Sequence, residues 1–299
     1  MNKGIVYGIG AYLLWGVFPI YWKILHVVPA LQVIGHRIAW SFILLGIYIL
    51  ITKQWNEFRS VAFHGKTLGV YAVASVLLTF NWLIYVWGVN AGFIVETSLG
   101  YFINPLLSVL LGVLFLRERL RLMQWIPVGL AAMGVVYLTF VYGRLPWIAL
   151  SLAFTFGFYG FVKKLSPLGS LYGLTLETGI AFPLALLYIG FVGFTGSGAF
   201  LHNGTKVDLF LIGSGVVTTI PLLMFASAAK QIPLSLVGLL QYVAPTIQFL
   251  IGVFVYKEQF DWQHFIGFAI VWVALIIFAG ESYFANRVLV EPIPELGEG

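Results

Sequence analysis

The chain has no cysteine and carries very little charge. None of its 299 residues is Cys, and only 9% are Asp, Glu, Lys or Arg, against about 25% in an ordinary soluble domain. Without cysteine, a disulfide framework, a thiolate metal site and a cysteine nucleophile are all excluded. The low charge excludes a water-soluble fold, because 61% of the residues are hydrophobic and too little polar surface remains to cover them.

The sequence also lacks the motifs of enzymes and ATP-driven pumps. It has no Gly-rich phosphate loop that ends in Lys-Ser/Thr, no HExxH pattern and no GxSxG pattern. Its five histidines are scattered without the spacing of metal ligands. We therefore expect no catalytic activity, no cofactor and no metal, and no ATP-driven transport by this chain alone.

What the chain does have is a series of long apolar segments. Gaps with charged residues, Gly or Pro separate them, and roughly 20 apolar residues suffice to cross a hydrocarbon core of about 30 Å as a helix. The sequence predicts an all-α membrane protein of about ten transmembrane helices. The segments cover residues 4–25, 31–52, 67–89, 94–116, 123–142, 146–163, 170–195, 209–229, 234–256 and 263–285.

The basic residues indicate how these segments are oriented. Eleven lie in the gaps on one side, four on the other and Arg37 inside a span, which accounts for all 16 Lys and Arg residues. The side with more basic residues is normally cytoplasmic, so both termini are predicted to be in the cytoplasm. The net charge of +5 is thus interpreted as a topology signal, and nucleic acid is not an expected partner.

The two halves of the chain resemble each other. A shift of 140 residues places Pro105 on Pro245 and Glu118 on Glu258, so that Pro precedes Glu by thirteen residues in both halves. With five helices per half, an odd number, the second half enters the membrane from the opposite side. The sequence predicts two five-helix inverted-topology repeats, 1–142 and 143–286, followed by a short cytoplasmic tail, 287–299.

Four segments carry a family resemblance. They are WGVFPIYWK at 15–23, HRIAWS at 36–41, NWLIYVW at 81–87 and GYFINPL at 100–106. Together they resemble RarD-type permeases of the EamA branch of the drug/metabolite transporter superfamily, over residues 1–285. The resemblance implies ten helices in two EamA repeats, a bacterial plasma membrane, and transport of small metabolites, amino acids or drugs.

Two charged residues fall inside predicted spans. Arg37 lies in the second span, and the 140-residue shift places Glu177 at the equivalent position. A buried charge in the membrane is costly and usually faces protein or a cavity. We expect both residues to line a central cavity, either as a pair or by binding the two charged ends of a zwitterion. The alternatives are that Arg37 reaches the outer surface and that Glu177 stabilises packing.

Polar and aromatic residues in the spans are further candidates for solute binding. An amide beside aromatic rings suits a solute with one polar and one apolar end, although interfacial aromatic belts and hydrogen bonds between helices explain such residues equally well. The repeat places Tyr101 and Gln241 at the same position. The candidates are Asn81, Trp82, Tyr85, Tyr101, Asn104 and Gln241.

Three other residues are candidates for moving parts or for energy coupling. Pro105 and Pro245 each remove a helix hydrogen bond and bend their spans, which predicts either a hinge or a fixed kink. Glu96, at the outer start of the fourth span, could couple transport to a proton gradient or could serve as an N-terminal helix acid. Glu118 and Glu258 are expected to form interfacial ion pairs or helix caps.

Together these features predict a secondary transporter that works by alternating access and has its solute site between the halves. The alternatives are a membrane-embedded enzyme or lipid-processing protein, or a membrane interaction protein that transports nothing. The expected partners are a small-molecule solute and membrane lipid. The sequence leaves open whether the chain is a monomer or a homodimer.

Overall fold

The regular secondary structure is helical throughout the part of the chain that the structure describes. The computed structural model describes residues 3–116, 122–141, 143, 145–232 and 240–288. Five helical segments among them are long and apolar enough to cross a membrane, which confirms the predicted all-helical architecture. These five segments are Lys3–Ile24, Ala30–Ile51, Gly65–Asn90, Ser170–Phe194 and Thr205–Gln231.

The helices follow the predicted apolar segments closely. Shorter apolar stretches lie in four further helical segments: Trp125–Val141, Trp147–Lys163, Val243–Val255 and Trp262–Ala274. In chain order the elements are α1 (Lys3–Gly16), α2 (Phe18–Ile24), α3 (Ala30–Ile51), α4 (Trp55–Ala62), α5 (Gly65–Asn90), α6 (Ile94–Leu116), α7 (Leu122–Val141), α8 (Trp147–Leu165), α9 (Ser170–Phe194), α10 (Thr205–Gln231), α12 (Val243–Leu250), the π-helix η1 (Ile251–Val255) and α13 (Trp262–Val288).

The first apolar segment is not one straight helix. It divides at Val17 into α1 and α2, and Pro19 stands in the first turn of α2, where a missing backbone N–H is tolerated. A short helix that the apolar pattern did not predict, α4, follows α3 in the gap before α5. This helix is polar on average and amphipathic, which is why a search for apolar runs does not find it.

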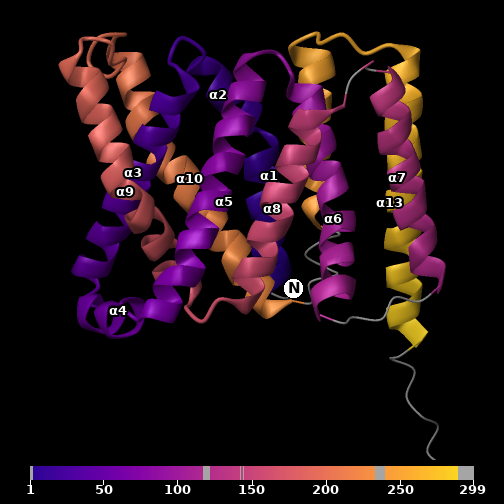
Figure 1. Cartoon of the computed structure of the whole chain (residues 1–299), viewed down its shortest axis with the longest axis horizontal. Helices are drawn as coiled ribbons and strands as arrows, with labels where there is room; N and C mark the ends of the chain where they lie inside the picture. The colour runs from indigo at the N-terminus through magenta and orange to yellow at the C-terminus, as the bar shows by residue number, and fades with distance from the viewer. Residues whose placement is uncertain (1–2, 117–121, 142, 144, 233–239, 289–299) are drawn as a thin grey trace, which may run out of the picture. The chain divides into compact units, whose positions relative to one another are not determined.

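The helices form two compact units. One contains Met1–Gly112 and Trp147–Gln259, and the other contains Val113–Pro146 and Phe260–Gly299. In the larger unit α3 packs against α9 and α10, α5 packs against α8 and α9, and α1 packs against α10 (Figure 1). In the smaller unit α7 and α13 pack against each other. Helices far apart in the sequence therefore share the core of the larger unit.

Glycine allows close approach at two helix contacts, between α3 and α10 and between α6 and α8. A Cβ atom added at Gly215 of α10 would lie 2.6 Å from the backbone carbon of Trp40 in α3. A Cβ atom at Gly100 of α6 would lie 2.6 Å from the backbone oxygen of Ala149 in α8. Small residues at such crossings let helix backbones pack tightly in a membrane, and these two contacts hold α3 and α8 in place.

Replacing Gly215 with alanine is expected to lower the melting temperature of the purified protein. The new methyl group would also lie 2.9 Å from the backbone nitrogen of Ser41, so α3 would have to shift. Overpacking of this kind typically costs about 1–3 kcal/mol. The matched control is Gly46→Ala, since nothing lies within 4 Å of a Cβ atom there. Equal melting temperatures for the two variants would contradict the close approach of α3 and α10.

Candidate functional site

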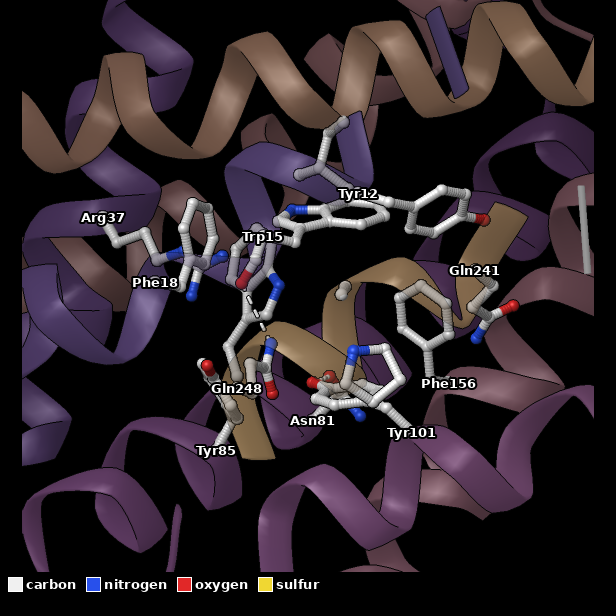
Figure 2. Close-up of a pocket in the computed structure, with 14 residues that line it drawn as sticks. Tyr12, Trp15, Phe18, Arg37, Asn81, Tyr85, Tyr101, Phe156, Gln241 and Gln248 are labelled. Carbon is white, nitrogen blue, oxygen red and sulfur yellow. Dashed lines mark hydrogen bonds between the residues drawn. The ribbon is translucent and has the colours of Figure 1, made fainter. Parts of the chain in front are cut away.

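The larger unit encloses a buried cavity of about 40 Å³. Its lining comes from α1, α2, α3, α5, α6, α8, α10 and α12, and thus from both halves of the sequence. A cavity of this size has room for a few water molecules. The lining residues are Tyr12, Trp15, Phe18, Arg37, Asn81, Trp82, Tyr85, Tyr101, Phe156, Leu222, Gln241, Ala244, Pro245 and Gln248 (Figure 2).

Aromatic rings form most of the cavity wall. The rings of Trp15 and Phe156 meet edge to face, with their centroids 6.1 Å apart. Tyr101 meets Phe156 in the same way at 5.9 Å, and the rings of Tyr85 and Tyr101 are 5.6 Å apart. Such edge-to-face pairs have a defined geometry and add about 0.5–1.5 kcal/mol beyond the burial of their surface. The wall is therefore apolar and well packed.

Among the described residues that line the cavity, Arg37 alone carries an ionic group. Its side chain is 2% exposed, and its guanidinium carbon lies 3.9 Å from the ring centroid of Trp82 and 4.8 Å from that of Trp22. Its Nε donates a hydrogen bond to the hydroxyl oxygen of Thr218 at 2.6 Å. The positive charge is thus placed on aromatic faces, an arrangement that attracts a cation to the ring quadrupole.

The amide of Asn81 is largely occupied by other protein groups. Its nitrogen donates to the carbonyl oxygen of Leu152 at 3.1 Å and to the hydroxyl of Thr155 at 2.9 Å. Its oxygen accepts a hydrogen bond from the hydroxyl of Tyr101 at 3.0 Å. Asn81 therefore lines the cavity. Its hydrogen bonds connect α5 to α8 and hold the ring of Tyr101 in place.

Two glutamines bring amides into the cavity from the second half of the chain. Gln248 of α12 donates to the backbone oxygen of Trp15 at 2.9 Å, which ties α12 to α1. Gln241 lies just before α12 and is 8% exposed. In Figure 2, Arg37 lies toward one side of the pocket and Gln241 toward the other. The polar groups are thus spread along the cavity, with aromatic rings between them.

The predicted pair of Arg37 and Glu177 does not form. Glu177 is absent from the lining of the cavity and accepts a hydrogen bond from Lys163 Nζ at 2.7 Å and from the hydroxyl of Tyr159 at 3.1 Å. Arg37 lies in α3 and Glu177 in α9, which pack against each other. The side chain of Arg37 contacts Thr218 of α10, whereas that of Glu177 contacts Lys163 of α8.

The other predicted residues divide between the cavity and its surroundings. Tyr85, Trp82, Tyr101, Gln241 and Pro245 line the cavity. The remaining three, all in α6, are buried but are not among the lining residues: Glu96, Asn104 and Pro105.

Asn104 lies where α6 meets α8. A Cβ atom added at Gly157 of α8 would lie 3.1 Å from the side-chain oxygen of Asn104. The residue thus packs at a close helix contact. This position is consistent with a role in helix packing, which was the alternative to solute binding for the polar residues in the spans.

Glu258 caps the N-terminus of α6. Its two carboxylate oxygens accept hydrogen bonds from the backbone N–H groups of Ile94 and Val95, both at 2.8 Å. Burial raises the pKa of Glu258 above its ordinary value, while the two backbone N–H groups and Lys23 oppose that rise. The cap satisfies two of the donors that every helix start leaves without a partner. Its repeat counterpart, Glu118, lies outside the described residues.

Replacing Glu258 with alanine is expected to loosen the start of α6. The N–H groups of Ile94 and Val95 would lose their acceptors, and a buried donor left without a partner costs about 1–3 kcal/mol. Hydrogen exchange at these two amides should therefore speed up, and the melting temperature should fall. The exposed neighbour provides the control, Gln259→Ala, which should change neither measurement. Unchanged exchange at the start of α6 in the Glu258 variant would contradict the cap.

Several lining residues were not among the predicted site residues. They are Tyr12, Trp15 and Phe18 near the N-terminus, with Phe156, Leu222, Ala244 and Gln248 in the second half. The sequence repeat relates two of them to each other. Trp15 is matched with Phe156 when the 140-residue shift is lengthened by one residue. Apolar and aromatic residues are so frequent in this chain that residue type alone could not single them out.

Long apolar helices around a buried cavity with a few polar groups are the architecture of a membrane transport protein. The family model for the EamA-like transporter family matches twice, at residues 2–140 and 145–280. The chain therefore belongs to the EamA-like transporter family, and it is a multi-pass membrane transporter.

Individual relatives agree with this assignment. The chain is 47% identical to a Bacillus subtilis protein named uncharacterized transporter YojE, over 93% of each chain. It is 42% identical to protein RarD of Streptomyces exfoliatus, over 96% of this chain and 91% of the relative. The resemblance to RarD-type permeases is thereby confirmed.

A solved structure resembles the fold. One crystal structure matches with a TM-score of 0.62 at 18% sequence identity, over 96% of this chain and 99% of the other. A likeness at this level of identity concerns the fold alone.

Proposed function

We propose that the chain is a secondary transporter that carries one small solute, a metabolite, amino acid or drug, by alternating access through the aromatic cavity. The observation that carries this proposal is Arg37, a charged group buried within the bundle at the wall of a cavity that both halves line. An ionisable group at membrane depth marks a solute or ion pathway by default. The residues that we propose to bind the solute are Arg37, Trp82, Tyr85, Tyr101 and Gln241.

The positions of the helices support two inverted five-helix repeats, at about 1–142 and 143–286. The helices α3 and α9 begin at Ala30 and Ser170, and α5 and α10 begin at Gly65 and Thr205, each 140 residues apart. The packing repeats as well: α1 packs against α10 as α8 packs against α5. With ten spans, the bias of basic residues supports a topology in which both termini lie in the cytoplasm, at a bacterial plasma membrane.

The size of the cavity supports a conformational cycle. A pocket that holds a drug-sized ligand usually has about 300–1,000 Å³, against about 40 Å³ here. We take this conformation as a closed one, and in the proposed cycle the solute enters when the two halves move apart on one side. Pro105 lies inside α6, where it removes a helix hydrogen bond, and Pro245 lies in the first turn of α12. These two prolines are the proposed hinges.

Coupling to a proton gradient is assigned to Glu96. Its side chain is 3% exposed in the first turn of α6, the helix start that Glu258 caps. A buried carboxylate at a helix that borders the cavity can change its charge as the surrounding structure opens.

Transport is tested by counterflow in proteoliposomes that contain the purified chain. A thermal-shift screen of amino acids, metabolites and drugs first identifies solutes that raise the melting temperature of the protein. These solutes are then loaded into the proteoliposomes. At least one of them should exchange across the membrane faster than in liposomes without protein. A solute that binds tightly but never crosses would overturn the proposed function and favour a binding protein.

A further inference from the structure

The charge of Arg37 is not balanced by any acidic group that the structure describes near it. None of the 14 residues that line the cavity is Asp or Glu, and the described ion pairs do not include Arg37. The carboxylate of Glu177, which occupies the equivalent repeat position, is bound by Lys163 at 2.7 Å. The guanidinium therefore relies on three aromatic rings and the hydroxyl of Thr218. A buried cation without a counter-ion is costly in a membrane.

The cavity also contains hydrogen-bond donors that have no partner. The Nη1 atom of Arg37 and the hydroxyl of Tyr85 are buried and make no hydrogen bond in the described structure. Figure 2 shows both residues on the same side of the pocket. Because more than about 90% of buried polar groups in proteins are paired, these two groups are available to hydrogen-bond an acceptor that enters the cavity. An oxygen of the solute is such an acceptor.

The rest of the cavity suits an apolar body. Away from Arg37 most of the wall is apolar and includes the rings of Trp15 and Phe156, with Leu222 and Ala244. The polar groups there carry no charge: they are the amides of Asn81, Gln241 and Gln248 and the hydroxyls of Tyr12 and Tyr101. A positively charged amine would find no carboxylate in this lining and would be repelled by Arg37. A phosphate dianion would need more than the single cation present. The chemistry of the cavity therefore favours one negative charge on an apolar or aromatic molecule.

From these contacts we infer that the solute is an organic monocarboxylate whose carboxylate binds Arg37 and Tyr85 while its apolar body lies against Trp15 and Phe156. This inference rests on the proposed function, since it names the solute class of the same cavity. It replaces the zwitterion that the sequence suggested, because the carboxylate expected to bind an ammonium group, Glu177, is directed to Lys163 instead.

The test compares ligands that differ only in charge. The purified full-length protein is titrated with phenylacetate, indole-3-acetate and hexanoate, with their uncharged amides and with the corresponding amines, and its melting temperature is followed. At least one carboxylate should stabilise the protein, while its amide and amine should not. In Arg37→Gln the affinity for that carboxylate should fall by about 30-fold or more, as is typical when one partner of a buried charge pair is truncated.

Two further variants separate a specific site from general attraction to a basic protein. Arg37→Lys keeps the charge but loses the planar donor set, so it should retain only part of the affinity. Lys206→Gln removes an exposed positive charge at the start of α10 and should leave the affinity unchanged. A similar loss in the Lys206 variant, or stabilisation by the amines, would overturn the inference. So would the absence of stabilisation by every carboxylate.

The outcomes also separate this inference from the proposed function. If amides or amines bind in the cavity and cross proteoliposome membranes, the chain is a transporter but the anion assignment is wrong. If a carboxylate binds through Arg37 and never crosses, the anion assignment stands and transport is wrong.

Discussion

Replacing Arg37 with methionine is expected to abolish solute transport without destabilising the protein. The aliphatic part of the side chain is kept, and an unpaired ion whose burial costs several kcal/mol is removed. The substitution removes the cation–π contacts of Arg37, each contributing about 0.5–2 kcal/mol, and its hydrogen bond to Thr218. The burial cost outweighs these contacts, so the melting temperature without ligand should stay the same or rise. Residues kept for function at a cost in stability behave in this way.

The measurement combines a thermal melt of the ligand-free protein with flux in proteoliposomes. Lys206→Gln again provides the control for a lost positive charge, and it should match the unaltered protein in both assays. A large fall in melting temperature for Arg37→Met, with full flux in the protein that remains folded, would show that Arg37 stabilises the bundle and does not serve the solute.

The opposite result is expected for Lys163, a cation whose side chain is 13% exposed. Lys163→Met should destabilise the protein strongly, because it leaves the carboxylate of Glu177, which is 1% exposed, without its partner at 2.7 Å. Breaking a buried ion pair from one side typically costs about 3–5 kcal/mol. Tyr159 alone, which donates to the other carboxylate oxygen at 3.1 Å, cannot replace the lost charge. The fall in melting temperature should therefore be much larger than for any Arg37 variant.

The double variant Lys163→Met, Glu177→Leu gives this prediction its control. Removing both charges leaves no ion unpaired, and replacement of a buried pair by apolar residues is often neutral. Stability should return, and solute flux should return with it if the pair only holds α8 against α9. If the double variant is stable but loses flux, the pair takes part in transport, contrary to the structural role derived from its contacts.

The helices could be predicted well because the membrane imposes one solution on an apolar chain. Lipid offers no partner for backbone groups, so each apolar run must satisfy its own hydrogen bonds as a helix. The segment predicted at 170–195 is observed as α9, Ser170–Phe194. The break at Val17 and the short α4 were not predicted, since neither changes the apolar pattern on which the prediction relied.

The residues that the repeat matches in sequence do not all come together in the structure. The matched pair Tyr101 and Gln241 both line the cavity. Trp15 and Phe156, which were not predicted as site residues, are also matched, and their ring centroids are 6.1 Å apart. Arg37 and Glu177 are matched in sequence as well, yet they face different helices. A twofold relation brings together only positions near its axis, and a sequence alignment does not show how far a position lies from that axis.

The partners of the buried charges could not be read from the sequence. Lys163 was counted among the basic residues of a loop, but it lies in α8 and reaches the buried carboxylate of Glu177. Thr218, which accepts the hydrogen bond of Arg37, is one of several threonines in apolar surroundings. Side-chain direction depends on how each helix is rotated in the bundle, and packing between distant segments determines that rotation.

The central claim, that the aromatic cavity is the site of transport, is tested most directly by filling it. Ala244 lines the cavity and is 6% exposed, so Ala244→Leu would occupy the space that the solute needs. Ala132→Leu, at an exposed position of α7, serves as the matched control. Proteoliposome counterflow of a stabilising solute should be lost in the Ala244 variant and retained in the control, with both proteins folded. Undiminished flux through a folded Ala244→Leu protein would contradict the assignment of this cavity as the transport site.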